Sequence, residues 1–181
     1  GVGFAPPEPL RFDFYELASD ASYEIDLFGG IRRSVEASRG DALTAQAELD
    51  AARVSVAAEV ARGVTRLFCR RDWFAMCEVP LPNGRRADLM AIDGKGHLTI
   101  VEIKVSKADL LADLKWRDYL DYCDRFFWAV DADFPTEILP PDHGLILADA
   151  YDAEIVRMSP STPLAAARRK ALMQKFARHA A

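Results

Sequence analysis

The chain has 181 residues, half of them hydrophobic, which predicts a single domain with a sizeable core. No run approaches the ~18 consecutive apolar residues of a membrane span and no basic-then-apolar leader indicates export, so we expect a cytoplasmic protein outside the membrane. Three cysteines without Cys-x-x-Cys spacing and three scattered histidines argue against a disulfide framework, a zinc site and a histidine-based catalytic site.

The net charge of −5 is concentrated at the N-terminal end. The first 50 residues carry 4 Lys and Arg against 10 Asp and Glu, a net of −6, which leaves 19 against 18, or +1, for the rest of the chain. This segment contains Pro6, Pro7 and Pro9 and has no coherent apolar face. We therefore predict a loosely ordered acidic extension over residues 1–45 and a folded domain over residues 46–181.

A helix is predicted from about Ala51 to Cys69, because apolar residues recur there at spacings of three and four. A first strand, Trp73–Val79, follows and ends at Pro80. The apolar stripe of the helix consists of Val56, Val60, Val64 and Leu67, widened by Ala57, Ala61 and Phe68.

Two further strands are predicted around a turn in the middle of the chain. Residues 85–92 form one strand, residues 101–105 form the other, and the linker between them contains Gly94 and Gly96, which suit a hairpin turn. In the second strand, a period of two places Glu102 and Lys104 on one face and the three aliphatic residues on the other.

The hairpin brings Asp88 towards Glu102, so two carboxylates and the Lys104 ammonium could converge at the strand ends. Mg²⁺ binds one or two carboxylates together with carbonyl oxygens and waters, and Mn²⁺ could replace it. A lysine beside such an ion can orient the attacking water and offset charge on a phosphate. The chemistry that this set predicts is metal-assisted hydrolysis of a phosphodiester.

The remaining elements complete an α/β fold with a mixed sheet. The order helix, three strands, helix, strand is an αβββαβ core, and a basic amphipathic helix closes the chain. The elements predicted after residue 105 are helical segments at 108–114 and 116–122, strands at 125–130, 144–148 and 153–158, and a helix at 163–180.

The sequence resembles the MmcB-like DNA-repair proteins and, more broadly, the PD-(D/E)XK nuclease superfamily, although Ala87 stands where the superfamily name has proline. The resemblance covers residues 55–160 and implies a restriction-endonuclease-like core. The matching motifs are Ala61-Arg62-Gly63-Val64, Arg86-Ala87-Asp88-Leu89, Val101-Glu102-Ile103-Lys104-Val105-Ser106 and Lys115-Trp116-Arg117-Asp118-Tyr119-Leu120.

The resemblance also implies roles for individual residues. Asp88 and Glu102 would hold Mg²⁺ with help from the Ile103 carbonyl, Lys104 would position the water, and Glu59 would face the site as a further metal ligand. A surface pair between Glu59 and Arg62 is the alternative.

Substrate-binding roles fall on polar residues around this site, and DNA is the expected partner together with other repair proteins. A Gln-x-x-x-Tyr pair of some relatives corresponds to Lys115 and Tyr119, with lysine in place of glutamine. The alternative is that Lys115 is a surface charge and Tyr119 a core residue. The other predicted phosphate contacts are Arg62, Arg86, Ser106 and Lys107.

Three functions follow. The leading one is a Mg²⁺-dependent endo- or exonuclease that acts in DNA repair. The second is a repair accessory domain of the same fold that binds nucleic acid or a protein partner without turnover. In the third, Glu102 and Lys104 form an ion pair in an unrelated α/β domain, because Glu-x-Lys is common on strands.

Overall fold

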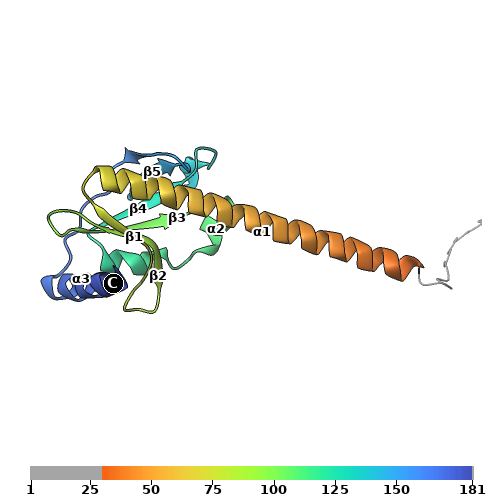
Figure 1. Cartoon of the computed structure of the whole chain (residues 1–181), viewed down its shortest axis with the longest axis horizontal. Helices are drawn as coiled ribbons and strands as arrows, with labels where there is room; N and C mark the ends of the chain where they lie inside the picture. The colour runs from red at the N-terminus through yellow and green to blue at the C-terminus, as the bar shows by residue number, and fades with distance from the viewer. Residues whose placement is uncertain (1–29, 181) are drawn as a thin grey trace, which may run out of the picture. The chain divides into compact units, whose positions relative to one another are not determined.

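The computed structural model describes residues 30–180, and the side chains of residues 33–180. A six-stranded mixed sheet forms the centre of the compact unit Thr44–Ala181 (Figure 1). No helix within residues 30–180 is long and apolar enough to cross a membrane. The elements are α1 (Gly30–Arg70), β1 (Phe74–Pro80), β2 (Arg86–Ile92), β3 (Leu98–Ile103), α2 (Lys107–Ala112), the 3₁₀ segment η1 (Trp116–Tyr122), β4 (Arg125–Val130), η2 (Thr136–Ile138), β5 (Gly144–Ala148), β6 (Ala153–Arg157) and α3 (Ala166–Ala180).

The strands lie in the sheet in their order along the chain, β1 to β6. Antiparallel pairs join β1 to β2, β2 to β3 and β5 to β6, and parallel pairs join β3 to β4 and β4 to β5. The crossover from β3 to β4 contains α2 and η1, as a parallel connection requires. This confirms the predicted mixed α/β fold with a C-terminal helix.

The start of α1 differs from the prediction. The helix begins at Gly30, whereas the apolar stripe predicted a start near Ala51. Side chains 33–52 are all exposed, so this part of α1 has no packed face for a periodicity argument to detect. Its Ala, Glu and Gln content favours helix through intrinsic propensity instead. Residues 30–45 are therefore helical where loose order was expected, and residues 1–29 of the predicted extension lie outside the described residues.

Both faces of β3 are buried, and each face belongs to a different core. Val101 and Ile103 pack with Val60, Val64 and Phe68 of α1, together with residues of β4 and β5. The predicted helical stripe therefore does cover one face of the sheet.

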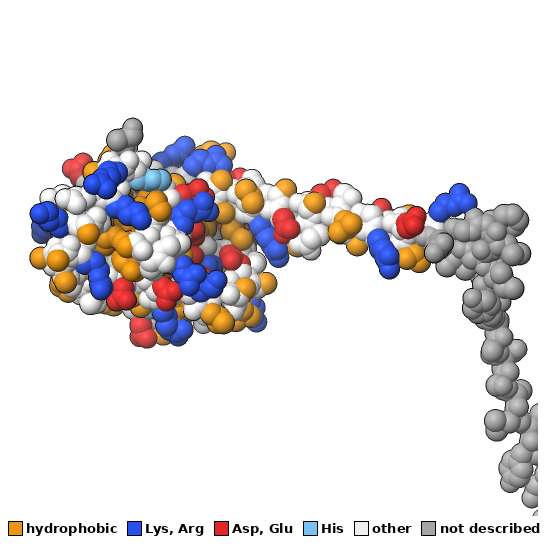
Figure 2. Space-filling model, turned by 90° about the horizontal axis from the view of Figure 1, so that it is seen from below, with side chains coloured by type: hydrophobic (Ala, Val, Ile, Leu, Met, Phe, Trp, Pro, Cys, Tyr) orange, Lys and Arg blue, Asp and Glu red, His pale blue; other side chains and the backbone are white. Residues whose placement is uncertain are grey.

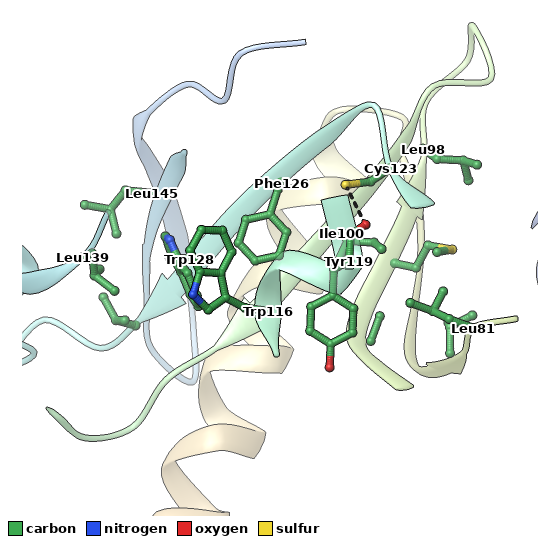
Figure 3. Close-up of a cluster of buried hydrophobic side chains, with 14 of the residues drawn as sticks. Leu81, Leu98, Ile100, Trp116, Tyr119, Cys123, Phe126, Trp128, Leu139 and Leu145 are labelled. Atoms are coloured by element: carbon green, nitrogen blue, oxygen red, sulfur yellow. Dashed lines mark hydrogen bonds between the residues drawn. The ribbon is translucent and has the colours of Figure 1, made fainter. Parts of the chain in front are cut away.

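The opposite face of the sheet packs against η1 and α3. Its centre is an aromatic cluster in which Trp116 contacts Phe126 and Trp128 with ring centroids 5.8 and 5.3 Å apart (Figure 3). Leu172 and Phe176 of α3 belong to the same core. Because the central strands are covered on both sides, polar side chains at their ends stand out as exceptions.

Gly63 fixes the point where α1 meets the β5–β6 turn. A Cβ atom at this position would lie 2.3 Å from the Asp149 carbonyl oxygen and 2.5 Å from that of Asp152. Arg66 donates hydrogen bonds to the two carbonyls between them, each at 3.1 Å. Only glycine permits this approach, and α1 is held firmly at its C-terminal end.

Asp124, whose side chain is fully buried, joins α3 to the sheet through an ion pair with the partly exposed Arg169. The guanidinium donates to both carboxylate oxygens at 2.7 Å. Each oxygen also accepts a backbone N–H, from Leu98 at 2.7 Å and from Leu164 at 2.9 Å. These bonds hold the pKa of Asp124 below its ordinary value against the opposing effect of burial.

Candidate active site

The site begins where the pairing of β2 with β3 ends. The register runs as far as Leu89 opposite Val101, and beyond it the Asp88 carboxylate accepts the Ile103 N–H at 2.9 Å. The side chain thus supplies the acceptor at the point where the strands separate. This bond fixes the Asp88 carboxylate beside the C-terminal end of β3.

Glu102 and Lys104 lie next to Asp88 and contact each other. Lys104 Nζ donates to Glu102 Oε1 at 3.2 Å and to Asp113 Oδ2 at 2.7 Å, and Asp109 Oδ1 is 4.0 Å away. Glu102 and Lys104 are only 6% and 4% exposed. The predicted convergence of these two side chains is therefore present, as a buried hydrogen-bonded pair.

Glu102 Oε2 is buried and has no hydrogen-bond partner among the described residues. Burial and, after it, the neighbouring Asp88 carboxylate raise the pKa of Glu102 to about 8 against the opposing effect of Lys104. Burial also raises the pKa of Asp88, although the Ile103 N–H and Lys104 partly offset this. Two adjacent carboxyl groups that resist ionisation are typical of a site that binds a cation or a proton.

Lys104 stays charged in these surroundings. Burial by itself would lower the pKa of its ammonium, but the Glu102 carboxylate, the hydrogen bond to Asp113 and the charge of Asp109 raise that pKa above its ordinary value. The Asp113 pKa is correspondingly low, because the bonds from Lys104 and the Lys115 N–H outweigh its burial.

A cavity of about 840 Å³ lies over these groups, between α1 and the ends of the central strands. Asp88, Glu102, Ile103 and Lys104 line one side of it. The α1 side is lined by Val54, Ala57, Ala58, Ala61, Arg62, Thr65 and Arg66, and the remaining lining residues are Cys77, Glu78, Val105 and Asp109.

The predicted phosphate-binding residues occupy different environments. Arg62 lines the cavity and donates one hydrogen bond, from Nε to the Ala58 carbonyl at 3.1 Å. Arg86 is exposed and forms an ion pair with Glu78 at 3.2 Å. Lys107 is exposed, without an ion-pair partner in the described part of the chain.

Ser106 has a structural role. Its hydroxyl accepts the Asp109 N–H at 3.1 Å as the N-cap of α2, and the Asp109 carboxylate accepts the Val105 N–H at 3.3 Å. This exchange is close to a capping box, which satisfies donors at a helix start. Ser106 therefore orients Asp109, which lines the cavity.

Lys115 and Tyr119 do not share a face. Lys115 is exposed and precedes η1, whereas Tyr119 is buried and donates its hydroxyl to the Arg86 carbonyl at 3.2 Å. The prediction assumed an α-helical spacing of four, but the segment is 3₁₀, in which residues three apart align. Trp116 and Tyr119 consequently form the inward face (Figure 3). Burial raises the pKa of Tyr119 to about 12, with Glu102 contributing.

Glu59 is half-buried on α1 and is not among the residues that line the cavity. The lining positions of α1 recur at spacings of one and three, 54, 57, 58, 61, 62, 65 and 66, and Glu59 lies on the flank of that stripe, next to Arg66 on the helix surface. Its role as a further metal ligand stays a prediction.

Sequence reasoning missed Asp109 and Asp113, the two further acids around Lys104. They are four residues apart immediately after the strand, a spacing at which helical side chains share a face. The spacing could have indicated that both acids lie on one side of α2, where Asp113 is the C-cap, near the end of β3.

The residues present fit a hard divalent cation. No group of three or more His, Cys, Asp or Glu side chains in residues 30–180 is arranged as a metal cage. Mg²⁺ does not require such a cage, because it keeps several waters and binds proteins through one or two carboxylates. Asp88 and Glu102, whose Oε2 has no partner among the described residues, could supply these ligands, and the Ile103 carbonyl belongs to the same strand end.

Charge around the site is mixed. Figure 2 shows one face of the chain, on which Lys and Arg side chains lie among acidic ones. The exposed ammonium groups of Lys107 and Lys115 flank α2 without an ion-pair partner among the described residues. Nucleic-acid contact would therefore depend on local basic groups near the cavity rather than on a broad positive field.

Comparisons with known proteins agree with this fold. The sequence profile described as "DNA repair protein MmcB-like" matches residues 44–181. A solved structure, the SPO1766 protein of unknown function from Silicibacter pomeroyi, is 53% identical in sequence and superimposes with a TM-score of 0.65. The match covers 67% of this chain and 84% of the SPO1766 chain. No curated protein matches the chain.

Proposed function

Since the chain belongs to the MmcB-like family of DNA repair proteins, we propose that it acts in repair as a metal-dependent nuclease of the PD-(D/E)XK type, which hydrolyses phosphodiester bonds of DNA in the cavity beneath α1. One observation carries the proposal: a buried carboxylate oxygen, Glu102 Oε2, lacks a partner within the described residues, next to Asp88 and a charged lysine. A buried carboxylate oxygen without a partner is costly for stability, which favours a ligand-binding role.

Asp88 and Glu102 would hold Mg²⁺ or Mn²⁺, with the Ile103 carbonyl as a further oxygen ligand. When bound, such an ion polarises the phosphoryl oxygen and lowers the pKa of a water ligand. Lys104, kept charged by Glu102, Asp109 and Asp113, would orient the attacking water and stabilise negative charge that develops on the phosphate.

Asp113 would keep the Lys104 ammonium in place, because its hydrogen bond at 2.7 Å is the shortest that Lys104 makes. The apolar wall of α1 would limit the access of bulk water to the site, which strengthens the interaction between these charges. Each step assigned to this chain is therefore one of binding, orientation or exclusion of water.

The test is a nuclease assay with Mg²⁺ or Mn²⁺ on single-stranded, duplex, flapped and mismatched DNA. Asp88→Asn, Glu102→Gln and Lys104→Ala should each lower cleavage by at least about 100-fold, since each removes a group that acts on the reacting phosphate. In metal-free buffer the first two should bind DNA as well as the wild type, and more tightly at a pH at which the replaced carboxyl group is ionised and repels the phosphate.

Glu78→Gln is the matched control. Glu78 lines the same cavity, but its side chain is 64% exposed and pairs with Arg86, so cleavage should remain within about threefold of the wild type. If the three site variants cut as fast as the wild type, the proposal is wrong. If no form of DNA is cut and all variants bind alike, the protein is a repair accessory domain.

A further inference from the structure

The position of the acids limits how a substrate can reach them. Glu102 and Lys104 are 6% and 4% exposed, at the inner side of a cavity that α1 covers. A phosphodiester can meet these groups only by entering the cavity. Its neighbouring sugar and base must then enter as well or fold away from the opening.

The α1 wall of the cavity carries a stripe of small apolar side chains beside Arg62, Thr65 and Arg66. Ala57, Ala58 and Ala61 form it, with Val54 at one end. A phosphate gains nothing from such a wall, whereas the flat face of a nucleobase does, because it is the apolar part of a nucleotide. The volume of about 840 Å³ lies in the range of about 300–1,000 Å³ for pockets that enclose small-molecule ligands, which suits a unit the size of a nucleotide.

The cavity continues along α1. A second hollow of about 510 Å³ shares Val54, Ala57, Val105 and Asp109 with the first and extends between α1 and α2. Arg62 lines the first hollow without an ion-pair partner among the described residues, whereas Arg53 lines the second together with its ion-pair partner Asp50. The two hollows together form a groove in which the apolar wall lies beside the Arg62 guanidinium, and single-stranded nucleic acids bind to such a combination of apolar and basic groups.

We infer that this groove takes an unpaired nucleotide strand, and that the substrate of the site is single-stranded DNA, or an unpaired end or flap, rather than intact duplex. The inference rests on the proposed function. A paired base is tied to its partner strand and must leave the helix before it can enter an enclosed site. Unpaired DNA enters without that cost.

The experiment measures binding in metal-free buffer at one fixed salt concentration, with a labelled oligonucleotide either alone or annealed to its complement. The variants are Ala58→Glu, which places a charge on the apolar wall, and Ala52→Glu, which places the same charge on α1 outside both hollows. Both alanines are exposed, so neither substitution displaces a packed side chain, and melting temperatures verify the fold.

The wild type should bind the single strand at least about tenfold more tightly than the duplex, as stacking and backbone contacts require unpaired bases. Ala58→Glu should weaken single-strand binding by about tenfold or more, and Ala52→Glu by less than about threefold. Equal binding of both DNA forms, or equal effects of the two substitutions, would overturn the inference.

Cleavage separates this inference from the proposed function. If no DNA form is cut while the binding pattern holds, the nuclease proposal fails and the groove assignment stands. If intact duplex is cut as fast as the single strand, the nuclease proposal stands and the groove assignment fails.

Discussion

Two buried carboxyl groups beside the central strands, Asp124 and Glu102, differ in how completely their oxygens are satisfied. At Asp124, both carboxylate oxygens receive a guanidinium N–H and a backbone N–H. At Glu102, one oxygen receives the Lys104 ammonium and the other receives no bond from a described residue. The pKa of Asp124 is lowered as a result, whereas burial raises that of Glu102 to about 8.

The difference separates a structural role from a functional one. A saturated buried pair holds two elements together, here α3 and the sheet, and has no capacity left for a ligand. An unsaturated pair lowers stability in the free protein and leaves a coordination position open. Burial and charge alone do not distinguish the two pairs. They are distinguished by the number of carboxylate oxygens that accept hydrogen bonds.

The largest effect is expected from breaking the saturated pair. Asp124→Ala should lower the free energy of unfolding by about 3–5 kcal/mol, because it leaves the Leu98 and Leu164 N–H groups without an acceptor and the Arg169 guanidinium without its counter-charge, bonded only to the Gly96 carbonyl. Chemical denaturation at pH 7 measures this. The control is Asp118→Ala, which removes an exposed carboxylate paired with Arg85 and should cost less than about 1 kcal/mol. Equal losses would contradict the structural role.

Glu102→Gln should raise the free energy of unfolding, whereas Asp124→Ala lowers it. The folded protein keeps the Glu102 proton up to about pH 8 while the unfolded chain releases it near its ordinary value of 4.5, so between these values the folded state binds more protons and loses stability as pH rises. Glutamine removes this loss. In metal-free buffer the variant should gain on the order of 2 kcal/mol over the wild type at pH 8 and little at pH 4.5.

Melting temperatures across pH 4.5–9 measure the Glu102→Gln effect, with the exposed Glu137→Gln as the matched control. The gap between Glu102→Gln and the wild type should widen as pH rises and level off above pH 8. A gap that stays constant over this range would show that Glu102 is already satisfied.

The smallest effect is expected at Asp113, the second partner of Lys104. Asp113→Asn should cost only about 1 kcal/mol in stability, because Glu102 remains as a partner and asparagine can still accept a hydrogen bond. Cleavage should fall by more than this loss of stability explains, with KM for DNA nearly unchanged, if Asp113 positions Lys104. A change in KM alone would assign Asp113 to substrate binding.

Much of the sheet could be predicted from the sequence. The bounds of β4 and β5 agree with the prediction because each is a continuous apolar run between turn residues. The meeting of Glu102 and Lys104 followed from a period of two, and that of Asp88 with the end of β3 from a glycine-containing hairpin. These features depend on contacts between segments close in the chain.

The features that escaped prediction depend on tertiary structure. No local sequence pattern indicated the ion pair of Asp124, because its partner Arg169 lies 45 residues later in the chain. The acids around Lys104 are brought in by the turn of α2 over the strand end. The prediction put Tyr119 on the same face as Lys115 by assuming an α-helical spacing, but η1 is a 3₁₀ segment. The missing oxygen partner of Glu102 is a property of packing, which no local pattern encodes.

The order of strands in the sheet also has a consequence for synthesis on the ribosome. Each strand from β2 to β6 adds to a neighbour that has already emerged, so the sheet can grow in one direction. Helix α1 emerges before every strand, yet Val64 and Phe68 belong to a core that also contains Phe127 and Ile146. Its packing against the sheet can be completed only after β4 and β5 have emerged, when more than half of the domain has been made. A ribosome-bound chain that ends before β4 therefore contains the acids of the site and α1 but lacks part of the core that holds α1 over them.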